Sequence, residues 1–327
     1  MRSNLSFQHA SARLRRCVTA WLTGAALFAG SGLQASDAGT GEGVYWRISR
    51  SGEDAGYLLG TIHSEDPRVL DFSPTFISQL TSCQVFAMEL VPDLETISRV
   101  NAYMQYPDAD TLERILGAKR YEQVMQALVA YRVPLEWKAR MKVWAVMITL
   151  SIPAPETGFF MDFSLSLRAA GAGMKVSGLE TLEQQLSFLE NMPADHQLAL
   201  LDQALSDHDR VEELNGEMVE VYLTGDLGAL QRLSDEQFAQ LDPAIRDYFL
   251  QGGISERNQH MAEKLLHLLQ ESQVFAAVGA LHLPGPDGLL ALLRQHGYDL
   301  QPVPLPFLTA PGQGTEQAAT KPGPATG

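Results

Sequence analysis

Two short segments of the chain share one pattern and decide the fold: Tyr57-Leu-Leu-Gly-Thr-Ile-His63 and Phe275-Ala-Ala-Val-Gly-Ala-Leu-His282. Each is an apolar run typical of a buried strand, and each ends in Gly-x-x-His followed by a turn-rich stretch. In open α/β sheets, ligands bind outside the carboxyl ends of the strands. Because the segments lie near opposite ends of the chain, we expect a fold that brings these ends together at one site.

Patterning along the rest of the chain predicts strands near both ends and helices between them. The strands are expected at 44–49, 56–62, 85–88, 174–177, 274–281 and 298–303, with the first two joined as a hairpin. Helical periodicity covers most of 96–270, including one helix over 135–150, and returns at 288–296. The predicted fold class is α/β: a single domain with a mixed β-sheet formed from strands near both chain ends and a large helical insertion.

The first 35 residues are expected to be a secretory signal peptide. They hold four arginines and no acidic residue, then an apolar stretch and small residues up to Ala35. The apolar stretch of about 14 residues falls short of the roughly 20 that a membrane span needs. We therefore expect cleavage and export, to the periplasm or the extracellular space. Residues 36–305 would form the domain, and 306–327, rich in Pro, Gly and Ala, a disordered tail.

The acidic balance of the chain excludes several classes of partner. The formal net charge is −15, and loss of the four arginines with the signal peptide makes it −19. Such a chain repels nucleic-acid phosphates and anionic membrane surfaces. We expect no nucleic-acid partner and no stable membrane anchor after signal cleavage. Cys83 alone remains after cleavage, which excludes an intramolecular disulfide.

Two acidic residues follow predicted strands in the same way as the histidines. Glu89 comes directly after the strand at 85–88, and Glu180 follows the strand at 174–177. A carboxylate at the end of an apolar strand is costly unless it is paired, hydrogen-bonded or bound to a metal. Two neutral imidazoles and a carboxylate leave coordination positions open, which suits a catalytic divalent metal with an activated water.

Each of these residues also has a purely structural interpretation. A histidine at a strand end, such as His63, is commonly a hydrogen-bonded turn residue, and Glu89 can cap a helix or pair with an arginine. Glu180 opens a helical run, where an acid favours the helix dipole. Arg257, in the first turn of a helix predicted to begin at Ser255, opposes the dipole, which indicates another role. The residues alone leave both interpretations open.

A set of motifs in fixed order adds a family resemblance. These motifs are Gly60-Thr-Ile-His63, Ala87-Met-Glu89-Leu90, Val176-Ser-Gly-Leu-Glu180-Thr, Glu256-Arg257-Asn258 and Val278-Gly-Ala-Leu-His282-Leu-x-Gly285. Together they resemble the TraB/PrgY/GumN family, which includes the Tiki proteins, over about residues 44–303. The resemblance implies an α/β domain in which two Gly-x-x-His motifs and a glutamate form a divalent-metal site. For Tiki members it implies a manganese- or cobalt-dependent metalloprotease activity.

The resemblance also assigns roles to matching positions of this chain. The implied metal ligands are His63, Glu89 and His282, and the implied catalytic residues are Glu180, Arg257 and Asn258. We expect Glu180 to act as the general base and Arg257 to hold the oxyanion or the substrate. Asp162 resembles an aspartate that the family often carries before a helix. Two positions depart from the family pattern: Leu281, where glycine is common, and Val221-Tyr222, where tryptophan is expected.

The sequence thus predicts an exported, divalent-metal-dependent hydrolase, with peptidase as the expected activity. The cofactor would be manganese, cobalt or zinc, and the substrate a peptide or small molecule. The competing hypothesis is an exported binding or regulatory protein that sequesters a peptide signal or a polysaccharide intermediate. Signatures of other hydrolase and nucleotide-binding classes, such as Gly-x-Ser-x-Gly, His-Glu-x-x-His and the Walker loop, are absent from the sequence.

Overall fold

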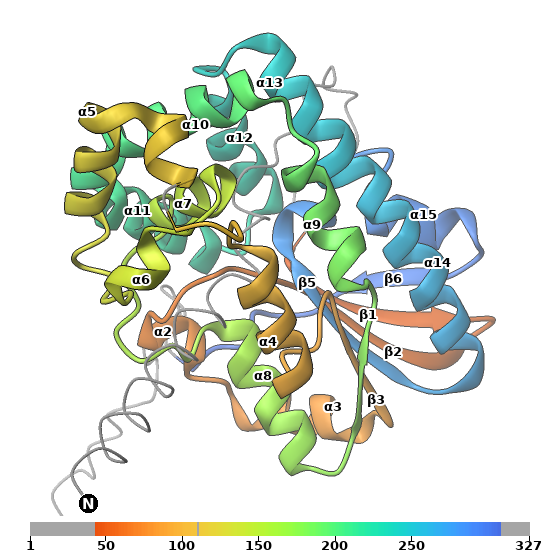
Figure 1. Ribbon diagram of the computed structural model, residues 1–327. Helices are drawn as coiled ribbons and strands as arrows, with labels where there is room; N and C mark the ends of the chain where they lie inside the picture. Colours follow the sequence, from red (N-terminus) through yellow and green to blue (C-terminus); the bar gives the residue numbers. More distant parts are fainter. Residues whose placement is uncertain (1–42, 110, 309–327) are drawn as a thin grey trace, which may run out of the picture.

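A six-stranded sheet forms the centre of the fold in the computed structural model, which describes residues 43–109 and 111–308 (Figure 1). The strand order is β4-β3-β5-β2-β1-β6. The strands are β1 (Tyr45–Arg50), β2 (Glu53–Thr61), β3 (Val85–Met88), β4 (Lys175–Gly178), β5 (Val274–Gly279) and β6 (Asp299–Pro302). The predicted signal peptide and residues 309–327 of the predicted tail lie outside the described residues.

The sheet is mixed and combines strands from both ends of the chain. Strand β5 pairs in parallel with β2 on one side and with β3 on the other, and β3 pairs in parallel with β4. Strand β1 is antiparallel to both β2 and β6. The hairpin between β1 and β2 turns at Ser51 and Gly52, both of which have positive φ. The predicted fold class is confirmed.

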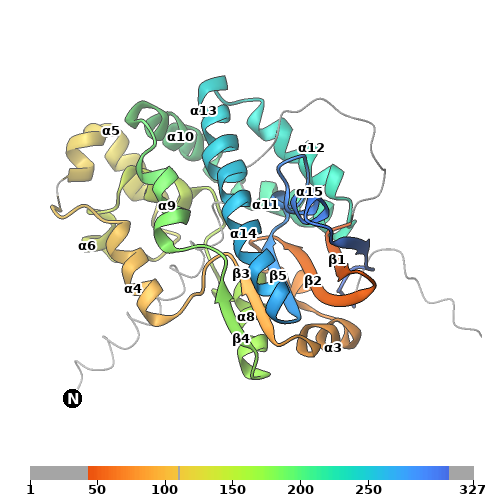
Figure 2. The ribbon, with the colours of Figure 1, turned by 90° about the vertical axis from the view of Figure 1, so that its right-hand side faces the viewer.

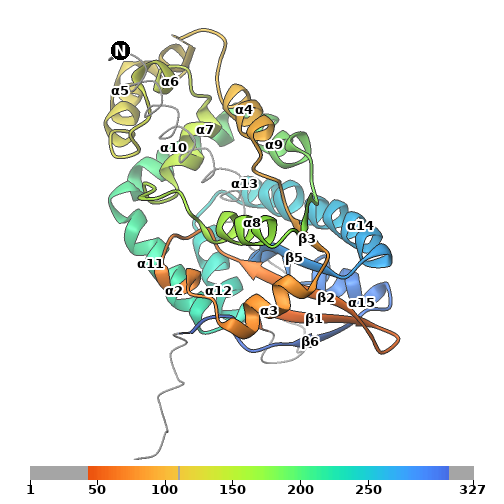
Figure 3. The same cartoon turned by 90° about the horizontal axis from the view of Figure 1, so that it is seen from below.

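Helices from the middle of the chain form the predicted insertion. They are α4 (Leu94–Tyr103), α5 (Thr111–Ala127), α6 (Leu135–Lys138), α7 (Val143–Leu150), α8 (Met161–Gly171), α9 (Leu182–Glu190), α10 (Ala194–Asp207), α11 (Val211–Leu223), α12 (Leu227–Phe238), α13 (Pro243–Tyr248) and α14 (Glu256–Glu271). Figures 2 and 3 show α5, α6 and α10 gathered on one side of the sheet, away from β1 and β6. In the described part of the chain, no helix is long and apolar enough to cross a membrane.

Shorter elements connect these helices to the sheet. They are α2 (Pro67–Leu70), α3 (Pro74–Ser82), the 3-10 turns η2 (His208–Arg210) and η4 (Ala280–His282), the π-helical turn η3 (Phe249–Ser255) and α15 (Leu289–Gln295). Helices α2 and α3 were not predicted from the sequence. Each begins at a proline, and the side chain of Asp66 or Ser73 caps the helix by accepting a backbone N–H. A first-turn proline and an N-cap were therefore the available signals.

Two apolar cores stabilise the two parts of the domain. In the sheet core, the ring of Phe275 on β5 contacts the rings of Tyr45, Phe76 and Phe86. In the insertion core, every residue of α7 is buried, and this helix packs against α10. Removing these side chains from water supplies most of the driving force for folding. The sheet edge that carries the predicted site lies where the two cores meet.

The prediction of one continuous helix over 135–150 is wrong, because the helix is interrupted between α6 and α7. The backbone N–H of Tyr106 donates to Arg140 O at 2.7 Å, and that of Lys142 donates to Met104 O at 2.8 Å. These bonds pair the segment with an extended strand-like neighbour, so its amide groups are not available to a helix. The apolar periodicity continues across the break, which explains the error.

Packing continues beyond the end at Leu305 that was predicted for the domain. Phe307 is buried and forms an isolated bridge with Phe72. The backbone N–H of Ser73 donates to Pro306 O at 2.7 Å. The segment from Leu305 to Leu308 therefore covers the sheet core beside α3.

Gly60 allows the two Gly-x-x-His segments to approach each other closely. It lies on β2 opposite Val278 of β5. A Cβ atom at this position would lie 2.7 Å from Leu283 Cδ1 and 2.9 Å from Ala280 Cα. Such distances are shorter than a carbon–carbon contact allows, so the glycine is required by the approach of η4 to the end of β2.

We predict that Gly60→Ala destabilises the protein by about 1–3 kcal/mol, because the new methyl group forces β2 and η4 apart. Urea unfolding of the purified chain measures this change. The matched control is Gly216→Ala in α11, where a Cβ would meet no atom within 4 Å. That substitution should stabilise the helix by about 0.5–1 kcal/mol. Equal unfolding free energies for the two variants would contradict the close-approach explanation.

Candidate functional site

The predicted site residues meet at the carboxyl edge of the parallel strands. His63 follows β2, Glu89 follows β3, Glu180 follows β4 and His282 ends the turn after β5. Because these four strands run in the same direction, their carboxyl ends lie at one edge of the sheet. Each of the four side chains is at most 5% exposed. The two histidines that are far apart in sequence therefore face one buried region.

Arg257 joins the two glutamates of this region. Its Nη2 lies 2.7 Å from Glu89 Oε2, and its Nε lies 2.9 Å from Glu180 Oε1 and 3.1 Å from Glu180 Oε2. Nη2 also donates to Glu180 Oε2. The exposed fraction of the Arg257 side chain is 2%. One buried cation therefore holds two carboxylates that come from different strands.

The environment shifts the pKa values of the two glutamates in opposite directions. Burial raises the pKa of Glu89, but the charge of Arg257, with smaller contributions from His282 and the N–H of Gly279, outweighs burial and holds it below its usual range. Burial also raises the pKa of Glu180, and here Arg257 does not fully offset the effect. Arg257 stays cationic, because the two carboxylates outweigh its own desolvation. Glu89 is therefore the firmly ionised member of the pair.

The position of Arg257 in its helix no longer conflicts with the helix dipole. The predicted start of this helix at Ser255 agrees with the bounds of α14, but α14 continues directly from the π-helical turn η3 and has no free N-terminus there. Ser255 has helical φ and ψ, and its side chain caps no backbone N–H. Arg257 is thus not at a free helix N-terminus, and its pairing with Glu89 and Glu180 accounts for a cation at this point.

Asn258 fixes the tautomer of His282. The Asn258 amide nitrogen donates to Asp287 O at 2.9 Å, so its Oδ1 accepts from the His282 Nδ1–H at 2.7 Å. The other ring nitrogen, Nε2, then carries a lone pair. It has no hydrogen-bond partner and lies 3.8 Å from Glu89 Oε1. Burial lowers the pKa of His282 to about 3, so the ring is neutral near pH 7.

Phe160 and the segment before it cover His63. The Phe160 ring stacks on the His63 ring with centroids 3.7 Å apart and planes 17° apart. The carboxylate of Glu65 accepts hydrogen bonds from the backbone N–H groups of Glu156, Thr157 and Gly158. We call residues 153–160 the cover segment. Burial lowers the pKa of His63 to about 3 despite the nearby charge of Glu89, so this imidazole is neutral as well.

Asp162 is a buried carboxyl group that contacts the end of β2 at Thr61. Its Oδ1 accepts a hydrogen bond from the Thr61 hydroxyl, whereas its Oδ2 has no hydrogen-bond partner. Burial, with a smaller contribution from Glu89, raises the pKa of Asp162 to about 7. The nearby Tyr222, which stands where a tryptophan was expected, donates to Gly60 O at 2.7 Å. It thereby holds the first Gly-x-x-His turn.

Two donors that orient Glu89 were not predicted from the sequence. The backbone N–H of Gly279 donates to Glu89 Oε1 at 2.7 Å, and Gln185 Nε2 donates to Glu89 Oε2 at 3.1 Å. Gln185 lies on α9, whose Thr181–Gln184 capping box sets the start of the helix. This capping pattern was a signal available in the sequence, because it sets where α9 begins and so places Gln185 in its first turn.

The donor groups of the site partly fit a divalent metal. The Nε2 lone pair of His282 faces an ionised carboxylate with no proton between them, and a cation would satisfy both. The Nδ1–H···Asn258 bond is the second contact that metal-binding histidines usually make. However, the described residues contain no group of three or more His, Cys, Asp or Glu side chains placed to hold a metal ion. His63, Glu89 and His282 are therefore not arranged as a set of three ligands in this structure.

We predict that Arg257→Met destabilises the protein by about 3–5 kcal/mol, because it leaves two buried carboxylates facing each other without a cation. Urea unfolding at neutral pH measures the loss, which should shrink in acid as the carboxyl groups become protonated. The control is Arg120→Met, which removes a solvent-exposed ion pair with Asp202 and should change stability by less than about 1 kcal/mol. Similar effects of the two substitutions would argue against a central role for Arg257.

We predict that Asp162→Asn changes how stability depends on pH. An aspartate in the unfolded chain ionises near its ordinary pKa of about 3.9, whereas the folded value is about 7. Between these values the folded protein binds one more proton than the unfolded chain. Wild-type stability therefore falls as pH rises, by at most about 1.4 kcal/mol per pH unit from this group.

The measurement is the difference in unfolding free energy between Asp162→Asn and wild type at several pH values. It should shift in favour of the variant from about pH 4 to pH 7 and stay constant above, because both states of wild type are then ionised. A difference that does not change with pH would show that Asp162 is not a proton-holding group in the folded protein.

Comparison with known proteins finds distant relatives that are named metalloproteases. "Metalloprotease TIKI2" of Danio rerio is 25% identical, over 76% of this chain and 58% of its own length. "Metalloprotease TIKI1" of Danio rerio is 25% identical, over 79% of this chain and 63% of its own length. The human "Metalloprotease TIKI1" is 22% identical, over 79% of this chain and 61% of its own length.

These alignments span only about three fifths of the length of the relatives. No solved structure matches the chain. Residues 44–302 match the TraB/PrgY/gumN family, nearly the same range as the resemblance seen in the sequence motifs. The chain belongs to the TraB/PrgY/gumN family and is distantly related to proteins named TIKI metalloproteases.

Proposed function

We propose that the protein is a divalent-metal-dependent hydrolase that cleaves peptide bonds. The observation that carries this proposal is the buried Nε2 lone pair of His282, which lies 3.8 Å from the ionised Glu89 carboxylate with no protein donor between them. Distant relatives named metalloproteases support it. Export to the periplasm or the extracellular space, with cleavage of the signal peptide, stays a prediction.

In this proposal, His282, Glu89 and His63 hold the metal, which is manganese, cobalt or zinc. When bound, such an ion lowers the pKa of a water molecule towards neutrality and so supplies a nucleophile. Arg257 keeps Glu89 ionised and fixes one of its oxygens. Asn258 keeps the lone pair of His282 pointing into the site. These residues set the direction of each ligand before any ion arrives.

Two carboxyl groups are candidates for the proton acceptor. Arg257 engages both oxygens of Glu180, the group expected to act as general base, so Glu180 can take a proton only by weakening this ion pair. Asp162 has an oxygen without a partner and a pKa of about 7, which suits proton transfer near neutral pH. We therefore assign proton transfer to Asp162 and the positioning of Arg257 to Glu180.

Arg257 was expected to hold the oxyanion or the substrate, but only one of its nitrogens remains available for this role. Its Nε and Nη2 are occupied by carboxylates, and its Nη1 makes only a long contact of 3.4 Å with Gly253 O. Nη1 is thus the donor with capacity for a substrate carbonyl. In this proposal, the guanidinium organises the site with two of its nitrogens and can contact substrate with the third.

A non-catalytic binding protein is the second candidate function. It is favoured by the burial of both histidines and by the lack of a group of three metal-binding side chains among the described residues. In that case the protein would sequester a peptide signal or a polysaccharide intermediate, and the polar network would serve to fix the fold. Metal content and turnover separate the two candidates.

We predict that the purified protein, dialysed against manganese, cobalt or zinc, retains about one metal ion per chain by elemental analysis. His63→Ala and His282→Ala should lose it, because each removes a ligand. His267→Ala, a histidine that is 62% exposed on α14, is the matched control and should keep it. Equally low metal content in wild type and both ligand variants would rule out the metal site.

Turnover is then tested by digestion of a peptide library with and without the retained metal. A metal-dependent cleavage that falls at least about 100-fold in Asp162→Asn would support Asp162 as the proton acceptor. A greater loss in Glu180→Gln with little change in Asp162→Asn would return this role to Glu180. Bound metal without cleavage of any peptide would favour the sequestering function.

A further inference from the structure

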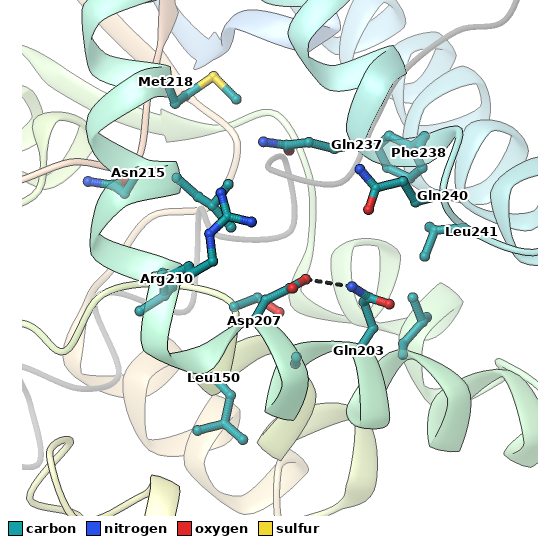
Figure 4. A pocket seen from close by; sticks show the side chains of 15 residues that line it. Leu150, Gln203, Asp207, Arg210, Asn215, Met218, Gln237, Phe238, Gln240 and Leu241 are labelled. Atoms are coloured by element: carbon teal, nitrogen blue, oxygen red, sulfur yellow. Dashed lines mark hydrogen bonds between the residues drawn. The ribbon is translucent and has the colours of Figure 1, made fainter.

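A cavity of about 170 Å³ lies within the helical insertion (Figure 4). Its walls come from α10, α11 and α12 and from the end of α7. None of the predicted site residues is among the residues that line it. The cavity has enough space for one large side chain together with a short piece of backbone, because a single water needs only about 10–15 Å³ on such a measure.

Three buried apolar side chains form what we call the floor of the cavity. Leu200, Met218 and Phe238 line it, and each is at most 5% exposed. These side chains belong to well-packed helices, and Phe238 also contacts the ring of Phe249 in the insertion core. An apolar group that enters here is removed from water at a preformed surface, which favours binding.

The rim of the cavity is rich in carboxamide groups. Gln203, Asn215, Gln237 and Gln240 line it, and Figure 4 shows Gln203, Gln237 and Gln240 on one side and Asn215 on α11 opposite them. Each carboxamide carries both a donor and an acceptor. A peptide group carries the same pair, so a polypeptide backbone can satisfy these side chains one by one.

The charges at the rim balance each other. Asp207 accepts a hydrogen bond from Gln203 Nε2 at 2.6 Å, and the Nε of Arg210 pairs with Glu213 at 3.1 Å. One cation and one anion among the lining residues give no excess charge. A phosphorylated or polyanionic ligand would need several cations here, and a polycation would need several anions. An uncharged ligand with regular donors and acceptors fits the rim better.

An oligosaccharide fits the cavity less well than a peptide does. Sugar rings commonly stack on an exposed aromatic face, but Phe238 is the one aromatic residue among the described residues that line the cavity. It is only 2% exposed and lies in the floor. Its ring therefore offers an apolar end to a side chain and no open face to a sugar.

We propose that this cavity binds an uncharged polypeptide segment, with an apolar side chain on the floor and the backbone amides paired with the rim carboxamides. The inference rests on the proposed peptidase function, for which it provides a substrate-binding region apart from the catalytic residues. The cavity and the sheet edge are lined by different helices and strands. A substrate that occupies both must therefore be a polypeptide that is several residues long.

Two continuous elements connect the cavity to the catalytic site. Met218 lines the cavity, and one turn later on α11 the hydroxyl of Tyr222 donates to Gly60 O beside His63. On the other side, Leu150 and Ser151 line the cavity, and the chain runs from there into the cover segment, whose Phe160 stacks on His63. A peptide held in the cavity would therefore contact α11 and the end of α7. These two elements lead to Tyr222, which contacts Gly60, and to Phe160, which contacts His63.

The test measures binding of blocked, fluorescent hexapeptides to the full chain by fluorescence polarisation, in the presence of EDTA. The probes are an uncharged peptide with a central leucine, the same peptide with a central aspartate, and an uncharged hexasaccharide. Ala204→Leu fills the floor of the cavity, and Ala199→Leu, exposed on the same helix, is its control. Gln237→Leu removes one rim carboxamide, and Gln231→Leu on the same helix lies outside the lining.

We expect the leucine peptide to bind at least about tenfold more tightly than the aspartate peptide and the hexasaccharide, because an apolar floor favours the side chain that leaves water most readily. Ala204→Leu should raise its Kd by at least about tenfold and Gln237→Leu by a few-fold, and both controls should leave it unchanged.

Several results would overturn the proposal: no saturable peptide binding, equal binding by cavity and control variants, or preferred binding of the hexasaccharide. If Ala204→Leu does not fold, Gln237→Leu decides the question. EDTA keeps this binding test independent of metal and turnover. Peptide binding without metal retention would refute only the hydrolase, and metal-dependent cleavage without cavity binding would refute only the cavity proposal.

Discussion

The buried pairing of Arg257 with Glu89 and Glu180 is the interaction on which the site depends. Two carboxylates at the ends of neighbouring parallel strands repel each other strongly where little water is present. The guanidinium offsets this repulsion and also fixes α14 against the sheet edge. Asn258, the next residue on α14, then meets His282 and fixes its tautomer. A single ion-pair network therefore positions the Glu89 carboxylate directly and the His282 imidazole through one further residue.

Because this network is buried, a ligand has no open path to the site in this structure. His63 and His282 are 4% and 0% exposed, so a substrate can reach them only if part of the surface moves. In the cover segment the side chains of Glu156, Thr157 and Phe159 are exposed, and the segment is held by backbone hydrogen bonds to Glu65 and by the packing of Phe160 on His63. Segments of this kind open at a lower free energy than packed helices do. Phe160 would then leave the face of His63 and expose it.

The positions of the strand ends could be predicted from the sequence, but the side chains that contact the residues at those ends could not. The apolar runs before His63, Glu89 and His282 locate the ends of β2, β3 and β5, because strand periodicity and glycine-bearing turns are local signals. The pairing of Arg257 with Glu89 joins residues 168 positions apart, and no local pattern encodes it. The sequence indicated only that Arg257 was unusual in its helix. In the same way, helix 135–150 was misjudged because a distant segment takes its backbone hydrogen bonds.

The charge balance of the buried groups connects the metal proposal to proton binding. Glu89 and Glu180 face one guanidinium, and both imidazoles are neutral, so full ionisation of the glutamates leaves one excess negative charge. Burial is the main cause of the raised pKa of Glu180 and of Asp162, and the negative charge of Glu89 adds to it, so a proton on either group reduces the excess charge. A divalent cation would neutralise the same charge and would favour the ionised carboxyl groups. If the protein binds metal as proposed, protons and metal would compete for one region, and metal binding would release protons there. A protein that only bound a neutral peptide would need this network for its fold alone, whereas a metal-dependent hydrolase would also use its excess negative charge. This difference is the physical reason to prefer the hydrolase over the binding protein.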